Sequence, residues 1–271
     1  MTVAWFHPFS GVAGDMALGA LVDAGADIDA VRAYLERLPI GGWAIEAHRV
    51  MRGTLSCTQV QVRIDHDLSS RSCRDILQLV EDAHYPEQLS KRVRSIFLAL
   101  ANVEGRLHGV APEDVHFHEV GGVDAIVDVV GTCAALELLD VDEVSAGPVA
   151  LGVGVIHAAH GRFPNPPPAV VRLLEGVPVT GVDIGVELTT PTGAALLSAL
   201  CTHWGSVPSM VVQASGFGAG SRDLIGMPNV TQVVLGVRRP NSLDPSGEET
   251  PSGLVAQGHH PSHQHAASTA N

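Results

Sequence analysis

Basic residues, aromatic residues and long apolar runs are all scarce in this chain, and each scarcity excludes a class of protein. Lys and Arg number 16 against 29 Asp and Glu, which gives a formal net charge of −13 and an isoelectric point near 5.4. With no basic patch to offset that charge, the chain should repel nucleic acids and anionic membranes, so we expect it to bind neither. The best candidate for a membrane span begins after Ile126, but Asp128 and Glu137 interrupt it.

Cysteine is also rare, and its positions exclude two further kinds of structure. The four cysteines lie far apart, at positions 57, 73, 133 and 201. Without a C-x-x-C pair, neither a disulfide framework nor a zinc ribbon is expected. The chain also lacks an N-terminal basic region followed by a long apolar run, which is the pattern of a signal peptide. These features favour a reducing, cytoplasmic setting.

Small aliphatic residues are abundant instead: 45% of the residues are hydrophobic, while only 4% are aromatic. This content is enough to bury a sizeable core. Apolar residues follow helical spacing in some segments, such as Pro86–His108, and alternate in others, such as Ser56–Ile64. We therefore predict a mixed α/β (α+β) fold, with helices packed on a mixed sheet, in one domain or two subdomains over residues 1–237.

Beyond residue 237 the composition changes to Pro, Ser, Gly, Gln and His. Residues 238–271 hold too few large apolar side chains to form a core, so we predict a disordered C-terminal tail. The histidines of its segment GHHPSHQH are of a kind that collects nickel or zinc loosely.

The densest group of metal-binding and acidic residues is the segment VHFHEVGGVDAIVDVVG, from Val115 to Gly131. His116 and His118 are two residues apart, so on a strand both imidazoles would point to the same side. Neutral imidazole binds nickel, zinc and copper, and Asp128 adds a carboxylate from the predicted helix that follows. The segment therefore predicts a site for a divalent metal.

The same residues also have a purely structural interpretation. Asp124 lies near the start of the predicted helix, where the helix dipole and unpaired N–H groups stabilise a carboxylate without any metal. Either His116 or His118 could equally be a core histidine whose hydrogen bonds are satisfied. A motif of this kind predicts a site but does not establish one.

A second candidate is the glycine-rich segment FSGVAGDM, which connects a predicted strand, Val3–His7, to a helix that starts near Gly14. Ser10, Gly11 and Gly14 would let backbone N–H groups approach a phosphate at the helix start. The segment matches neither a P-loop nor a dinucleotide fingerprint. The alternative is a tight strand-to-helix turn in which the helix dipole stabilises Asp15.

The segment GVIHAAHGRFPNPPP supplies two more histidines, His157 and His160, followed by a proline-rich arm. Proline restricts the backbone to extended conformations and reduces the entropy lost on ordering, so this arm could line a pocket without being helical. His160 is the candidate metal ligand of the pair. The alternative is a structural loop with one surface histidine.

Two later segments could bind an anion. In ELTTPTGAALL, Thr192 and Gly193 lie at the start of a predicted helix, where a hydroxyl and free N–H groups could bind a phosphate or carboxylate; the alternative is an ordinary N-cap by Thr192. In GFGAGSRD, predicted as a flexible loop over Gly216–Asp223, Arg222 supplies a cation. That loop could fold over an anionic ligand or simply connect two strands of a hairpin.

Taken in order, these segments resemble those of one family. FSGVAGDMALGALVDAGA, VHFHEVGGVDAIVDVVG, HGRFPNPPPAV, ELTTPTGAALL and GFGAGSRD follow one another as they do in nickel insertion proteins of the LarC family. The resemblance covers roughly residues 3–235, and HFHEVG and TPTGAA are its most specific parts. It implies CTP-dependent insertion of nickel into pyridinium-3,5-bisthiocarboxylic acid mononucleotide, which forms the nickel-pincer cofactor of lactate racemase-type enzymes.

The resemblance gives the candidate residues expected roles. Nickel would be held until the sulfur atoms of the substrate capture it, and the expected ligands are His116, His118, Asp128 and His160. Forming a nickel–carbon bond requires loss of a ring proton, for which Glu119 and Asp124 are candidate bases. The residues expected to bind the mononucleotide are Ser10, Gly11, Gly14, Asp15, Thr192, Gly193 and Arg222.

The chain departs from the family pattern at three points. Many members begin the first motif with an acidic residue and a cysteine, where this chain has His7 and Pro8. The usual histidine-rich loop after the second strand is reduced to His66, and the C-terminal histidines could substitute for it. Complete members also carry a second domain associated with CTP use, so the resemblance implies a separate C-terminal CTP-binding domain as a partner.

Three functions follow from the sequence as alternatives. The first is a nickel-inserting enzyme, a cyclometallase of the lyase class, with nickel as substrate and CTP with Mg²⁺ or Mn²⁺ as requirements of the family. The second is a non-catalytic nickel carrier that supplies a CTP-using partner. The third is an unrelated phosphometabolite enzyme that uses the glycine-rich loops. In each case we expect a homo-oligomer.

Overall fold

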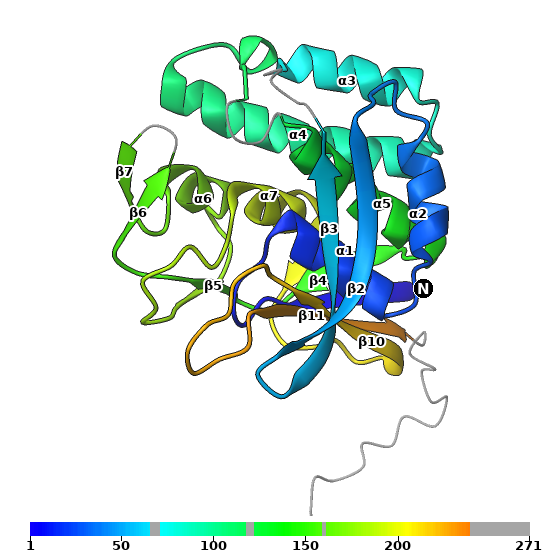
Figure 1. The fold of residues 1–271 in the computed structure, drawn as a ribbon, viewed down its shortest axis with the longest axis vertical. Helices are drawn as coiled ribbons and strands as arrows, with labels where there is room; N and C mark the ends of the chain where they lie inside the picture. The colour runs from blue at the N-terminus through cyan, green and yellow to red at the C-terminus, as the bar shows by residue number, and fades with distance from the viewer. Residues whose placement is uncertain (66–70, 118–121, 159–160, 239–271) are drawn as a thin grey trace, which may run out of the picture. The chain divides into compact units, whose positions relative to one another are not determined.

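The computed structural model describes residues 1–65, 71–117, 122–158 and 161–238 (Figure 1). The helices are α1 (Gly14–Asp23), α2 (Ile28–Leu35), α3 (Cys73–Asp82), α4 (Glu87–His108), η1 (Pro112–Asp114), α5 (Val123–Leu138), α6 (Pro168–Leu173) and α7 (Pro191–Leu200). The strands are β1 (Thr2–His7), β2 (Trp43–Arg52), β3 (Leu55–Ile64), β4 (Glu143–Ala146), β5 (Val149–Leu151), β6 (Val155–Ala158), β7 (Gly161–Pro164), β8 (Val179–Gly181), β9 (Cys201–Trp204), β10 (Val211–Ala219) and β11 (Val230–Val237). The predicted mixed α/β fold is confirmed.

The described strands form one large sheet, in the order β2-β3-β10-β11-β1-β4-β9, and two small sheets, β5-β8 and β6-β7. β1 runs parallel to β4 and antiparallel to β11, and β10 is antiparallel to β11. The strands β1, β4 and β10 therefore all end at the same edge of the sheet. In α/β folds, ligands bind at the carboxyl ends of such strands.

The helices stack in layers on the sheet (Figure 1). α1 packs on β3, β10 and β11; α5 packs against α1, α2 and α4; and α4 in turn contacts α3 and α7. An apolar stripe at helical spacing along α5 is buried in the core; it is formed by Val123, Ile126, Val127 and Val130. Small residues on the other sides of α5 are buried as well, because this helix is surrounded by neighbours.

α1 lies unusually close to β10, and two glycines make the contact. A Cβ atom at Gly218 would lie 1.8 Å from the carbonyl oxygen of Met16, and one at Gly216 would lie 2.2 Å from that of Ala20. The prediction of a flexible loop over Gly216–Asp223 is therefore wrong for its first half, through which β10 continues. These glycines allow a helix to approach a strand backbone; they do not loosen the chain.

The local chain geometry sets two helix limits. The segment FPNPPP is not wholly outside a helix as predicted: Pro168 is the first residue of α6, a position where the missing N–H of proline costs no hydrogen bond. The helix α2 ends at Leu35. The chain tightens there, because Leu38 N–H donates to the carbonyl of Leu35 in a 3₁₀-type turn.

The structure also bears on the disulfide-bonded and membrane-spanning classes of protein that the composition argued against. All four cysteines are free, as expected from their spacing. Among the described helices, none combines the length and the apolar character needed to cross a membrane. The predicted tail begins at the last described residue, Arg238, so its remainder lies outside the described residues.

Candidate functional site

The turn after β1 is held rigidly by β11. The Ser10 hydroxyl donates to the carbonyl of Val230 (2.7 Å) and accepts from the Val230 N–H (3.1 Å). Gly11 has a φ of +96°; its N–H donates to the carbonyl of Pro8 (3.1 Å), and its carbonyl accepts from the Thr231 hydroxyl (2.7 Å). The structure thus gives these groups of Ser10 and Gly11 partners within the protein, while phosphate binding by them stays a prediction.

The residues just before α1 are joined to the segment just before α7. Val12 forms a parallel bridge with Thr189, and the carbonyl of Val12 accepts from the Thr190 N–H (3.0 Å). A Cβ atom at Gly193 would lie 2.1 Å from the Val12 carbonyl oxygen. Gly193 therefore lets the starts of α1 and α7 lie side by side.

The start of α7 is capped by Thr190. Its hydroxyl accepts from the N–H of Gly193 (3.2 Å), and Pro191 is the first helical residue. The alternative proposed for Thr192, an ordinary N-cap, is therefore wrong in its residue, because the capping hydroxyl belongs to the residue that precedes the proline. Thr192 is buried one position into the helix, so its role in ligand binding stays a prediction.

The third helix at this edge, α5, meets α1 through an aspartate. A Cβ atom at Gly14 would lie 2.6 Å from both Cβ and Oδ2 of Asp128. Asp15 lies close enough to Asp128 for its charge to act on that residue, and the Asp15 carboxylate accepts from the Met16 N–H (2.8 Å). At the start of α1, the Met16 N–H is therefore already bonded to a carboxylate of the protein.

Burial gives these two acids unusual electrostatics. It raises the pKa of Asp15 to about 6. Burial, and then the negative charges of Asp15 and Asp124, raise the pKa of Asp128 well above its usual range. In addition, Oδ1 of Asp128 is buried without a hydrogen-bond partner in the described part of the chain. The dipole at a helix start ordinarily stabilises a charged carboxylate and lowers its pKa. Here the desolvation caused by burial outweighs the dipole, so the pKa rises.

Asp124 lies at the same end of α5 but is exposed. It is the second residue of the helix, and a Cβ atom at Gly122 would lie 2.4 Å from its Oδ1. Its carboxylate is therefore folded back over the helix start. Its charge acts on Asp128, so the structure brings together Asp15, Asp124 and Asp128 from two of the predicted segments.

His116 lies beside the start of α3. Its backbone forms a bridge with Ser72, and its side chain is exposed, whereas the next residue, Phe117, is buried with its ring 6.4 Å from that of Phe97. Hydrogen bonds from Ser72 hold the pKa of Asp75 below its usual range, and the nearby His116 adds to that effect. The prediction that His116 and His118 point to the same side stays a prediction, because His118 lies outside the described residues.

The predicted ligands His118 and His160 and the candidate base Glu119 lie outside the described residues. Within the described ranges, no three His, Cys, Asp or Glu side chains gather into a group that could hold a metal ion. The structure therefore does not test whether the proposed nickel ligands come together in one site.

Arg222 lies on the loop between β10 and β11, at the same sheet edge as the end of β1. Its side chain is exposed, and its carbonyl accepts from the Asn229 side-chain amide (3.0 Å). The base of the loop is held by Arg52, whose guanidinium donates twice to the carbonyl of Gly220 (3.0 and 2.7 Å). No local sequence pattern marks Arg52, because its partner Gly220 is far away in the chain.

His7, where the chain departs from the family pattern, is stacked between two aromatic rings. Its ring centroid is 5.0 Å from that of Trp5 and 5.3 Å from that of Phe9. Alternation along β1 places Trp5 and His7 on the face opposite Phe6, which lies in the main core with the helices. His7 therefore points away from the helix starts.

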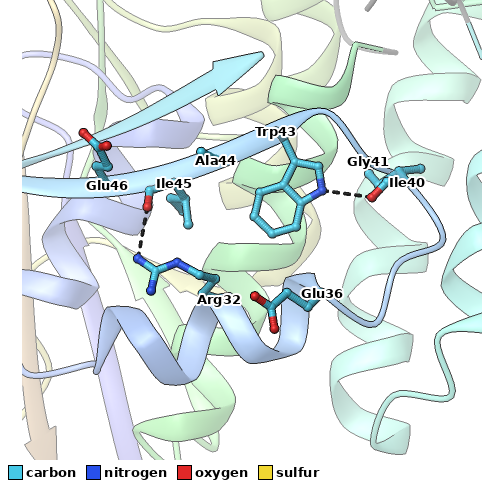
Figure 2. A pocket seen from close by; sticks show the side chains of 8 residues that line it. All are labelled: Arg32, Glu36, Ile40, Gly41, Trp43, Ala44, Ile45 and Glu46. Atoms are coloured by element: carbon cyan, nitrogen blue, oxygen red, sulfur yellow. Dashed lines mark hydrogen bonds between the residues drawn. The ribbon is translucent and has the colours of Figure 1, made fainter. Parts of the chain in front are cut away.

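An open recess of about 440 Å³ lies elsewhere, between α2 and β2 (Figure 2). Two of its polar groups already have backbone partners: Arg32 donates to the carbonyl of Ile45 (3.1 Å), and the Trp43 indole donates to that of Ile40 (3.1 Å). None of the predicted site residues lines this recess. The helix starts of α1, α5 and α7 remain the candidate site.

Comparison with known proteins gives this arrangement a context. A family model described as "Nickel insertion protein" matches residues 4–265. The chain is 42% identical over 243 residues to a protein of Syntrophobacter fumaroxidans (90% of this chain, 62% of that protein) and 43% identical over 258 residues to one of Roseiflexus castenholzii (93% and 63%). Both are named "Putative nickel insertion protein".

A third relative has a more specific name. A protein of Geobacillus kaustophilus is 39% identical over 246 residues (87% of this chain, 60% of that protein) and is named "Pyridinium-3,5-bisthiocarboxylic acid mononucleotide nickel insertion protein". No solved structure matches the chain. The chain spans about three-fifths of the length of these relatives.

Proposed function

Because the chain belongs to the nickel insertion protein family, we propose that it inserts nickel into pyridinium-3,5-bisthiocarboxylic acid mononucleotide. The observation that carries this proposal is the family match over residues 4–265, together with the name of the Geobacillus kaustophilus relative. The fold supports it with a place for an anionic substrate. Three helix starts converge at the carboxyl edge of β1, and the positive end of a helix attracts a phosphate.

The proposed reaction transfers nickel from nitrogen ligands to sulfur and carbon. Nickel held by His116, His118 and His160 passes to the two thiocarboxylate sulfurs of the substrate, which bind it more strongly because they are softer ligands. A ring C–H bond then breaks, its electron pair forms the nickel–carbon bond, and the proton goes to Glu119 or Asp124. Asp124 is exposed at the start of α5, so a bound substrate can reach it.

We further propose that CTP, with Mg²⁺ or Mn²⁺, is used by a separate C-terminal domain, and that the product serves lactate racemase-type enzymes. The support for a partner is that the chain spans about three-fifths of its relatives. The same fact favours a second candidate function. In that alternative, the chain is a nickel carrier that delivers the metal to its CTP-using partner without forming the nickel–carbon bond.

Mass spectrometry separates these functions. The purified chain is incubated with NiCl₂, CTP, MgCl₂ and the bisthiolated mononucleotide, with the Geobacillus kaustophilus relative as positive control. A substrate mass increased by one nickel and decreased by the displaced protons supports insertion. Nickel binding without that product supports the carrier. If the chain neither binds nickel nor changes the substrate, both proposals are wrong.

Calorimetry tests the nickel ligands directly. Replacing both His116 and His118 with Ala should weaken nickel binding at least tenfold, because the proposal assigns both imidazoles to the same nickel ion. The matched control replaces His48 and His203, two exposed histidines of other strands. An unchanged affinity and stoichiometry in the His116/His118 variant would remove these residues from the proposed site.

A further inference from the structure

The position proposed for the phosphate contains an electrostatic conflict. The start of α1 should attract an anion, but Asp15 and Asp128 already place two carboxylates there. A phosphate monoester carries up to two further negative charges near neutral pH. Without a positive charge between them, these groups would repel one another in a partly buried environment, where repulsion is stronger than in water.

We propose that Asp15 and Asp128 hold a hard divalent cation, Mg²⁺ or Mn²⁺, which bridges them to the phosphate of the bound mononucleotide. The identity of this ligand rests on the proposed function. The cation would neutralise the repulsion at the start of α1 and position the phosphate between α1 and α7.

An unsatisfied oxygen points to a ligand here. Oδ1 of Asp128 is buried, and it has no hydrogen-bond partner among the described residues. A buried carboxylate oxygen left in this state is costly, so it is expected to be occupied when the protein is at work. Gly14 lets this carboxylate lie directly against the start of α1, because a Cβ atom there would lie 2.6 Å from its Oδ2.

The number and type of donors indicate which cation fits. The described residues do not gather three His, Cys, Asp or Glu side chains in one place, so this site offers two carboxylates and no third such ligand. Mg²⁺ is commonly held by one or two carboxylates and completes its coordination with substrate phosphate and water. Oxygen ligands suit Mg²⁺ and Mn²⁺, whereas imidazole and sulfur suit nickel.

This division of ligands changes the role of Asp128. The sequence grouped it with His116 as a nickel ligand, but the structure pairs it with Asp15 across α1 and α5. The surroundings are firmly held, because Val12 is bonded to Thr190 and Ser10 is bonded to Val230. A site anchored in this way can keep its two carboxylates in place before the cation binds.

The inference is tested by Mn²⁺ binding to the metal-free full-length chain, followed by the loss of the free Mn²⁺ signal in electron paramagnetic resonance. The probes are nicotinic acid mononucleotide, a pyridinium mononucleotide without thiocarboxylates, and its riboside, which lacks the phosphate. The mononucleotide should tighten Mn²⁺ binding at least tenfold, and Mn²⁺ should tighten mononucleotide binding by the same factor. The riboside should have no such effect.

The variants Asp15→Asn and Asp128→Asn should each lose this coupling, because a neutral amide removes the charge while keeping the shape. Asp29→Asn is the matched control: Asp29 is also the second residue of a helix, α2, but it is exposed and paired with Arg32. If Asp128→Asn fails to fold, Asp15→Asn carries the test, since Asp15 is only half-buried.

The outcomes separate this inference from the proposed function. Mn²⁺ affinity that is independent of the mononucleotide, or coupling that survives in both variants, would overturn the cation site. Wild-type rates of nickel insertion by both variants would also overturn it and leave the proposed function standing. Coupling that is lost in both variants and retained in Asp29→Asn supports the cation site, whatever mass spectrometry shows about insertion.

Discussion

The start of α1 packs directly on Asp128 of α5, because a Cβ atom at Gly14 would lie 2.6 Å from Oδ2 of Asp128. Burial raises the pKa of the neighbouring Asp15 to about 6, and burial together with the neighbouring charges raises that of Asp128 well above its usual range. A helix start usually has the opposite effect on a carboxylate. This pair is therefore the most unusual charge arrangement at the three helix starts.

The first prediction concerns pH. The pKa of Asp15 is about 6 in the folded chain and near 3.8 when unfolded, so the folded state binds more protons between these values. The free energy of unfolding should therefore fall as pH rises from about 4 to 6.5, with Asp15 contributing on the order of 1–2 kcal/mol. In Asp15→Asn this fall should be smaller. Urea denaturation in EDTA at several pH values measures it, and an equally steep fall in the variant would contradict the assignment.

The second prediction concerns Gly14. In Gly14→Ala, the new Cβ would come within 2.6 Å of Asp128, so α1 and α5 must move apart. We expect a loss of roughly 1–3 kcal/mol in the free energy of unfolding, as for other overpacked sites. Gly185→Ala is the control, because a Cβ there meets nothing within 4 Å. Thermal unfolding of both variants measures the difference in stability. Equal stability would show that the helices tolerate the added atom.

The third prediction separates a structural role of Ser10 from a ligand-binding one. Ser10→Ala removes both hydrogen bonds to the backbone of Val230: the Val230 N–H keeps the carbonyl of Pro228, but the buried Val230 carbonyl loses the hydroxyl. We expect a cost of roughly 1–3 kcal/mol in stability and little direct change in mononucleotide affinity. Exposed Ser206 gives the control, Ser206→Ala. A large loss of affinity at unchanged stability would instead make Ser10 a phosphate ligand.

The fourth prediction concerns Arg222. Its side chain is exposed at the candidate edge, so Arg222→Ala should change the free energy of unfolding by less than about 0.5 kcal/mol. If the guanidinium reaches the phosphate, affinity for nicotinic acid mononucleotide should fall roughly three- to tenfold, as expected for loss of about one charge-assisted hydrogen bond. Calorimetry compares it with Arg106→Ala, an exposed residue of α4. Equal affinities would exclude Arg222 from the site.

Local patterns explain which predictions succeeded. The spacing of Leu89, Val93 and Ile96 predicted α4, and the alternation of Val60, Val62 and Ile64 predicted β3, because each pattern depends only on the geometry of its own element. The prediction of a flexible loop at the glycines of β10 was wrong because it needed information from outside its own element. Gly216 and Gly218 have no local signal that separates a flexible loop from a strand packed closely on α1.

The candidate site was predicted in part. The segments containing Gly14, Asp128 and Gly193 were each selected from the sequence, and the structure brings them to one edge of the sheet. Their pairing was not predicted. Asp128 was grouped with His116 because the two are close in the chain, whereas its partner in the structure is Asp15. The predictions for His118, Glu119 and His160 fall outside the described residues.

The amino-acid order alone determined the class of fold, most helices and strands, and the motifs that mark the family, since these depend on residues a few positions apart. Only tertiary structure decided that Asp15 would face Asp128 and that Thr190 would be tied to Val12. Those contacts follow from the order of the strands and from how closely the helices pack on them. The absence of a side chain at Gly14 and Gly193 allows the close approach of α1 to α5 and α7, and no local sequence pattern encodes it.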